Sequence, residues 1–156
     1  MKIILTETNF SKLKDLVKKA KSEEKTAIFT SEDDELNRKV VEKLEINILL
    51  INQKGRNDFQ KQRNSGFNQV LAKAMKKKSI ILGINLDELV EEKNLTNKAE
   101  IIARIKQNIF LCNKNKVQIQ FIVKDEKNNR NLHDLKSLGI VLGMPTWMTA
   151  KLSKQF

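Results

Sequence analysis

The sequence predicts an α/β fold built around a mainly parallel sheet. Short apolar runs of strand length recur along the 156 residues, and segments whose apolar residues recur at helical spacing separate them. This alternation is typical of βαβ units, in which successive strands pair in parallel and helices cover the sheet. Because no proline- or serine-rich linker interrupts the pattern, we expect one domain over residues 1–156, with a short tail at 146–156.

Five strands and five helices are expected, in alternation from the N-terminus. The strands are the apolar runs at residues 3–5, 27–29, 46–51, 80–84 and 117–123. Each expected helix has apolar residues three or four positions apart, which lie on one face of a 3.6-residue repeat. The five faces are Leu13, Leu16, Val17 and Ala20; Leu36, Val40, Val41 and Leu44; Phe67, Val70, Leu71, Ala74 and Met75; Ile101, Ile105, Ile109 and Cys112; and Leu135, Leu138 and Leu142.

Capping residues indicate several of the helix ends. Ser31 is expected to cap the second helix and Asn131 the last one. Asn97 and Glu100 have the spacing of a capping box ahead of the fourth helix. Pro145 follows the last helix, where proline commonly stands because it cannot continue a helix.

One connection is long and polar. Residues 53–65 link the third strand to the third helix and contain a single apolar residue, Phe59. In parallel α/β folds, the loops that follow the carboxyl ends of strands are the usual ligand-binding segments. A long polar connection at this position is therefore predicted to be functional, with a disordered surface loop as the alternative.

The positive charge is concentrated next to this connection. The whole chain has a formal net charge of +11, of which residues 54–78 carry eight basic and one acidic group. Residues 1–53 have no net charge, with ten groups of each sign. A local excess of this kind is typical of proteins that bind the phosphate backbone of a nucleic acid.

Residues able to catalyse a reaction or bind a metal are sparse. The single histidine, His133, lies beside Asp134 at an expected helix start and indicates neither a zinc site nor a catalytic pair. Cys112 lies on an apolar stripe and is expected in the core. The acidic residues at 33–35 and 91–92 are best explained as solvated charge, and no glycine-rich phosphate-binding motif is present. We therefore expect a binding protein with no cofactor of its own.

A membrane location is not expected either. No apolar run is long enough to span a bilayer, and the first apolar stretch is too short for a secretory signal. A single cysteine excludes an internal disulfide. We expect a cytoplasmic protein.

The residues best suited to RNA lie in and after the polar connection. Residues 63–66 (RNSG) lead into a helix, whose free N–H groups and dipole favour a phosphate. Because the chain has seven Phe, one Trp and no Tyr, we expect recognition of RNA backbone and shape rather than base stacking. An ordinary lysine-coated solvent face is the alternative. The candidate RNA-binding residues are Arg56, Arg63, Asn64, Ser65, Asn68, Gln69, Lys73, Lys76 and Lys77.

Three motifs resemble segments of one protein family. Residues 63–71 (RNSGFNQVL) fit the pattern R-[ND]-S-G-[LF]-N-x-V-L, and residues 103–112 (ARIKQNIFLC) fit A-R-x-x-Q-N-I-x-L-C. Residues 130–144 (RNLHDLKSLGIVLGM) fit R-x-x-x-D-L-x-x-L-x-x-x-L-G-M. In this order and spacing, the chain resembles protein component 3 of archaeal and eukaryotic ribonuclease P. Residues 1–52 align with that family in little beyond the alternation of strands and helices.

The resemblance implies a TIM-barrel-like scaffold that assembles with a companion protein and ribonuclease P RNA to remove 5′ leaders from precursor tRNA. In that family the RNA carries the chemistry with Mg²⁺, so no catalytic residue is expected in the protein. Position by position, the resemblance groups residues 63–69 as one polar cluster and adds two more, which we expect to contribute to RNA binding. They contain Arg104, Gln107 and Asn108, expected on the same rim of the barrel as the first cluster, and Arg130 with Asp134. A scaffold role, in which Asn and Gln side chains bond loop backbones, is the alternative for some of these residues.

The closure of the barrel and three other functions remain open, one of them an assembly scaffold that contacts only protein. A complete barrel of eight βα units typically needs about 250 residues, so this shortened one either stays open or has its sheet edge covered by a partner. A general structured-RNA-binding protein would use the same basic segment. A metal-dependent phosphoesterase is the enzymatic alternative, although no ligand cluster indicates one.

Overall fold

Five parallel strands form a single sheet in the computed structural model, which describes residues 1–153. The strands pair in sequence order, and every neighbouring pair is parallel, as the sequence predicts. They are β1 (Lys2–Leu5), β2 (Thr26–Phe29), β3 (Ile48–Leu50), β4 (Ile81–Asn85) and β5 (Ile119–Ile122). Consecutive parallel pairing requires a crossover after each strand, and right-handed crossovers place the helices on one side of the sheet.

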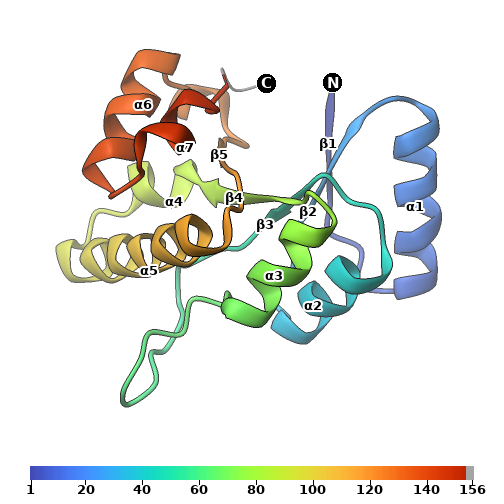
Figure 1. Ribbon diagram of the computed structural model, residues 1–156, viewed down its shortest axis with the longest axis horizontal. Coiled ribbons are helices and arrows are strands. Elements are labelled where there is room, and N and C mark those ends of the chain that lie inside the picture. Colours follow the sequence, from blue (N-terminus) through green and yellow to red (C-terminus); the bar gives the residue numbers. More distant parts are fainter. Residues whose placement is uncertain (154–156) are drawn as a thin grey trace.

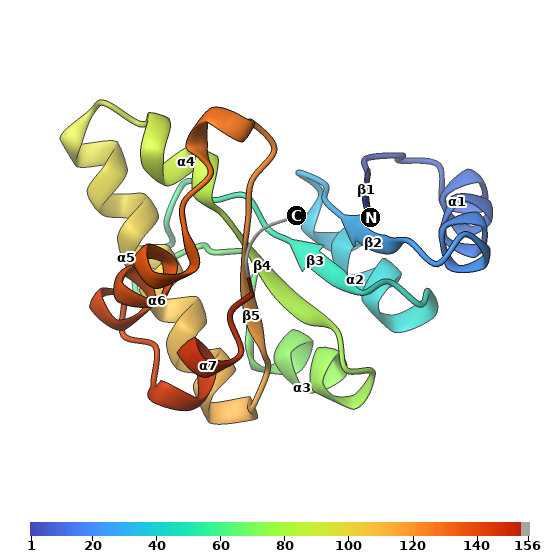
Figure 2. The same cartoon turned by 90° about the horizontal axis from the view of Figure 1, so that it is seen from above.

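Helices surround the outer face of the curved sheet (Figures 1 and 2). Seven α-helices and one 3₁₀ turn are present within residues 1–153. They are α1 (Phe10–Ser22), α2 (Asp34–Lys43), α3 (Gln69–Lys77), α4 (Leu86–Glu91), α5 (Leu95–Asn115), η1 (Glu126–Asn128), α6 (Leu132–Val141) and α7 (Thr146–Ala150).

Strand alternation separates two apolar clusters. In β2, Ala27 and Phe29 face the helices and join the main core, whereas Ile28 faces the inside of the curve. There it packs with Ile48, Leu50 and other branched residues, as inward-facing side chains of barrel strands do. The predicted TIM-barrel-like fold is confirmed.

The barrel is not closed. Within the described residues, β1 pairs with β2 alone and β5 with β4 alone, so both edges of the sheet lack a neighbouring strand. The sheet is nevertheless curved enough for the Lys2 ammonium of β1 to donate to the Val123 carbonyl beyond β5, over 2.8 Å.

Two predicted helix caps are wrong, because another residue caps each of these helices. Asp33, not Ser31, caps α2, because the Asp33 carboxylate accepts the N–H groups of its second and third helical residues. Asn94, not Asn97, caps α5, so that helix begins before the predicted capping box. The predicted Asn131 cap of α6 is confirmed.

The third helix begins later than its apolar stripe indicated. Asn68 is the N-cap, with its side-chain oxygen accepting the N–H of Leu71, so Phe67 precedes the helix. Phe67 is buried all the same, whereas Val70 is largely exposed. The helix instead buries Leu71, Ala72 and Met75.

The expected tail is partly helical. Residues 146–150 form α7, and the neighbouring Leu152 is buried against the main core. The Gln120 side chain of β5 donates to the Lys151 carbonyl over 2.7 Å and accepts the N–H of Ser153 over 3.0 Å. These bonds hold the segment against the last strand. Residues 154–156 of the predicted tail lie outside the described residues.

Candidate nucleic-acid interface

The long polar connection leaves the carboxyl end of β3 and extends from the body of the molecule (Figure 1). Within it, the Arg56 guanidinium binds both carboxylate oxygens of Asp34 in α2, over 2.9 and 3.0 Å. The same side chain donates to the Asn52 carbonyl over 2.7 Å. Arg56 therefore holds the connection against α2, and we do not propose it as an RNA contact.

Arg104 of α5 fixes the connection from the other side. Its side chain donates to the carbonyl oxygens of Gln53 and Arg56, over 3.0 and 2.8 Å, and to the Asp58 carboxylate over 2.9 Å. Arg104 is only 2% exposed. The fork of its guanidinium therefore joins three points of one loop, an arrangement that a lysine could not reproduce.

Asp58 links the first part of the connection to residues 63 and 64 at its end. Besides Arg104, it accepts the N–H of Asn64 over 2.9 Å and pairs with the Arg63 guanidinium over 3.0 Å. The Arg104 hydrogen bond, followed by that from Asn64, holds the pKa of Asp58 below its ordinary value. The carboxylate is therefore ionised at neutral pH and holds residues 58–64 together.

Two of the predicted polar clusters converge, as expected. The Gln107 amide of α5 reaches the Arg63 carbonyl over 3.3 Å and the Ser65 hydroxyl over 3.4 Å. Ser65 and Asn108 are nearly inaccessible to solvent, as is Arg104. Because all three are buried, direct contact with RNA is not proposed for them. Arg104 and Ser65 bond within or to the connection, whereas the Asn108 side-chain oxygen has no hydrogen-bond partner among the described residues.

The third predicted cluster lies apart. The Arg130 side chain donates to the carbonyls of Lys127 and Asn129, next to the start of α6. Asp134 accepts from the Asn131 amide in the first turn of that helix. His133 is exposed in the same turn, and Cys112 is buried in the core, where burial raises the pKa of its thiol.

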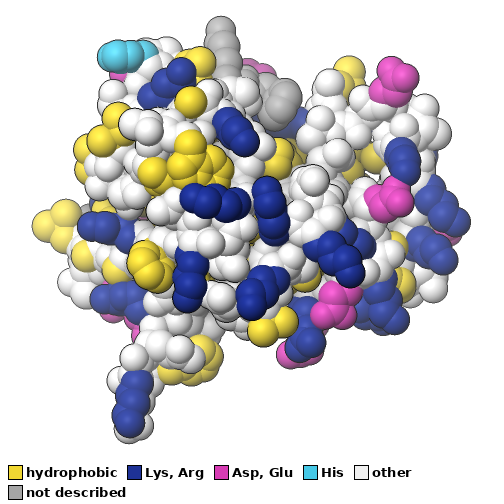
Figure 3. All heavy atoms as spheres, viewed as in Figure 1, with side chains coloured by type: hydrophobic (Ala, Val, Ile, Leu, Met, Phe, Trp, Pro, Cys, Tyr) yellow, Lys and Arg dark blue, Asp and Glu magenta, His cyan; other side chains and the backbone are white. Residues whose placement is uncertain are grey.

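The accessible candidates lie on and before α3. Arg63, Asn68, Lys73, Lys76 and Lys77 are exposed. Asn64 and Gln69 are half-buried beside them. Lysine and arginine side chains gather over the face that carries α3 and α5, with few acidic ones among them (Figure 3). Lys78, by contrast, donates to carbonyls at the end of α2.

A groove of about 660 Å³ lies among the connection, α3 and α5. Three of the side chains that line it are large, apolar and exposed: Phe59, Val70 and Phe110, with exposed fractions of 57, 62 and 68%. Sequence reasoning missed these as functional candidates. The available signals were that Phe59 is the one apolar residue of its segment and that Phe110 lies off the apolar stripe of its helix.

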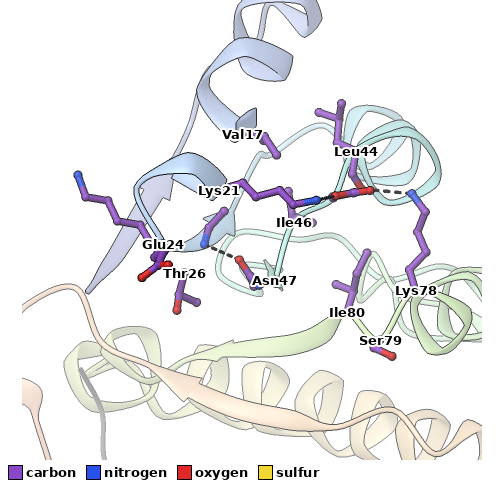
Figure 4. Close-up of a pocket in the computed structure, with 13 residues that line it drawn as sticks. Val17, Lys21, Glu24, Thr26, Leu44, Ile46, Asn47, Lys78, Ser79 and Ile80 are labelled. Atoms are coloured by element: carbon purple, nitrogen blue, oxygen red, sulfur yellow. Dashed lines mark hydrogen bonds and ion pairs between the residues drawn. The ribbon is translucent and has the colours of Figure 1, made fainter. Parts of the chain in front are cut away.

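A second hollow, of about 710 Å³, lies near the amino ends of the strands (Figure 4). Its lysines already have partners: Lys21 pairs with Glu45, and Lys78 donates to the Leu44 carbonyl over 3.2 Å. Lysines at the C-terminal ends of helices are also stabilised by the negative end of the helix dipole. The lysines of this hollow are therefore explained by their partners and by the helix ends on which they lie, and we propose no ligand for it.

Within residues 1–153, no group of three His, Cys, Asp or Glu side chains is placed to hold a metal ion. The same residues contain no helix both long enough and apolar enough to cross a bilayer.

Replacing Gly66 with alanine is expected to destabilise the protein by about 3 kcal/mol. Gly66 has φ +71°, and an added Cβ would lie 2.6 Å from the Arg56 guanidinium and 2.8 Å from the Asp34 carboxylate. Urea unfolding measures the change. Gly55→Ala is the matched control, since Gly55 has φ +76° but open space around it, and should cost about 1 kcal/mol. Equal losses in the two variants would show that the Arg56–Asp34 pair adjusts freely.

The structure defines an open, parallel βα barrel, with a loop held by buried side chains at the carboxyl end of its sheet and a basic helix, α3, that follows this loop. The chain is similar to a chain in the cryo-EM structure of archaeal ribonuclease P with mature tRNA, with a TM-score of 0.79 and 21% identity over 96% of this chain and 64% of that one. It also resembles the tetrameric deoxyribose phosphate aldolase from Aeropyrum pernix, with a TM-score of 0.51 and 13% identity over 92% of this chain and 58% of that one.

These matches confirm the predicted fold. This chain spans less than two thirds of the length of either of these two matched chains. No protein-family model matches the sequence, and no curated protein matches it significantly.

Proposed function

We propose that the protein is a subunit of ribonuclease P, of the component 3 type, which binds the catalytic RNA and a companion protein. The observation that carries the proposal is the structural similarity to a ribonuclease P chain over nearly the whole of this chain. The three sequence motifs point to the same family independently of the fold. The aldolase similarity is weaker and supports the barrel alone.

The charge distribution supports a binding role for the subunit. Most of the excess of positive charge lies in residues 54–78, and the lysines of α3 present part of it to solvent. In this role the RNA, with Mg²⁺, cleaves precursor tRNA, and the protein contributes phosphate contacts that reduce repulsion within the folded RNA. Arg63, Asn64, Asn68, Gln69, Lys73, Lys76 and Lys77 are the proposed contacts.

Reconstitution tests this function. Ribonuclease P RNA and its companion proteins are assembled at low Mg²⁺, with and without this chain, and cleavage of precursor tRNA is measured. Cleavage should rise when the chain is added, because its cations replace part of the Mg²⁺ requirement, and the chain alone should cleave nothing. If the assembly is active at higher Mg²⁺ but the chain never changes its rate, the proposed function is wrong. Metal-dependent cleavage by the chain alone would favour a phosphoesterase instead.

A further inference from the structure

Two phenylalanines that are far apart in the sequence line one surface groove. Phe59 comes from the long connection and Phe110 from α5, and both are more than half exposed. Val70 of α3 adds a third exposed apolar side chain to the same groove. An exposed apolar cluster held by three separate elements is costly to leave in water and generally marks a binding site.

The groove also contains many amide side chains. Gln62, Asn64, Gln69 and Gln107 all line it. Each amide offers both a donor and an acceptor, the combination that the hydrogen-bonding edge of a nucleobase requires. A surface that combines aromatic faces with adaptable amides is suited to flat, polar-edged ligands.

Lysines flank the apolar side chains on the same helix faces. Lys106 and Lys114 lie four residues before and after Phe110, one turn away on each side, and both are exposed. Lys73 is three residues beyond Val70 and equally exposed. Because α3 and α5 pack side by side, these cations lie on the two helices that flank the groove, and Arg63 lines the groove itself. Anionic chains with planar groups satisfy both features at once.

Two acidic residues of α2, Asp34 and Glu35, also line the groove, and they limit where the phosphates of such a chain can lie. Asp34 is neutralised by its pair with Arg56, whereas Glu35 is exposed on α2. A phosphate would be repelled beside Glu35. The phosphates would therefore follow the lysines of α3 and α5, with the bases pointing into the groove.

We propose that this groove binds unpaired nucleotides of RNA, with bases stacked on Phe59 and Phe110. The inference rests on the proposed function, because it requires that the protein binds RNA, and it changes the mode of recognition expected from the scarcity of aromatic residues. Unpaired nucleotides are required, since bases inside a helix have both faces covered by their neighbours. The groove would thus recognise a single-stranded segment within an otherwise structured RNA.

Leucine substitutions test the stacking. Phe59→Leu and Phe110→Leu keep an apolar side chain at an exposed position but remove the aromatic face. Each should weaken binding of a fluorescein-labelled single-stranded oligouridylate on the order of tenfold, as measured by fluorescence anisotropy. Binding of a duplex RNA of equal length should stay unchanged. Ile140→Ala, at a side chain 61% exposed on α6, is the matched control and should alter neither affinity.

The outcomes separate this inference from the proposed function. If the wild-type chain binds RNA and both leucine variants bind oligouridylate as tightly, stacking is overturned, and the apolar lining is better assigned to a protein partner. Equal weakening on single strands and duplexes would also overturn it. If the wild-type chain binds neither RNA and fails to stimulate the reconstituted enzyme, both proposals are wrong.

Discussion

Arg104→Ala is expected to lower the free energy of unfolding by about 3 kcal/mol and to release the long connection from α5. The substitution removes the donors for the carbonyl oxygens of Gln53 and Arg56 and for the Asp58 carboxylate. Water can hydrate the partly exposed Asp58, but the site of the guanidinium itself is almost closed to solvent. Most of the lost hydrogen bonds are therefore not replaced.

Chemical unfolding and amide hydrogen exchange measure this effect. The exchange of residues 53–67 should accelerate, whereas that of the sheet should change only with global stability. Arg104→Lys should recover little, because a single ammonium cannot reach three acceptors. Arg130→Ala, at an exposed arginine bonded to carbonyls of its own loop, should cost less than about 0.5 kcal/mol. Unchanged exchange in Arg104→Ala would show that other contacts hold the connection.

The effect should depend on pH in a defined direction. Because the folded protein lowers the pKa of Asp58, the stabilisation from this carboxylate is present above the ordinary aspartate pKa and is lost as the pH falls through the lowered value. The difference in stability between the wild type and Arg104→Ala should therefore shrink in acid.

Replacing Lys73, Lys77 and Lys106 together with glutamine is expected to weaken RNA binding on the order of a hundredfold at physiological ionic strength. These exposed lysines lie on the two helices that flank the groove. Each lost phosphate contact should also reduce the slope of log K against log salt by about 0.7 to 0.9. Filter binding of a structured RNA over a range of salt concentrations measures both quantities.

The control must match the change in net charge. Lys12, Lys14 and Lys18 are exposed on α1, which lies away from α3 and α5 (Figure 1), so their triple glutamine variant removes the same charge elsewhere. That variant should change the slope little. Equal losses in both triple variants would show that the net charge of the chain, rather than a basic face, governs binding.

The sequence by itself determined the order and type of most elements. All five strands were predictable because a parallel strand covered on at least one face is a short apolar run, whatever its partners. The short helices α4 and α7 were not predicted, since six and five residues are too few to show a helical repeat. Val70 shows a further limit: it fits the apolar stripe by spacing, yet the Asn68 cap starts the helix where that face points to solvent.

The tertiary structure alone decided which candidate residues face solvent. Arg104 and Arg63 both lie within recognisable motifs. Arg104 is buried among hydrogen-bond acceptors that lie some fifty positions away in the sequence, whereas Arg63 remains accessible. The same packing brings Phe59 and Phe110 to one groove. Burial of a polar side chain depends on partners that long-range folding supplies, and local periodicity carries no information about them.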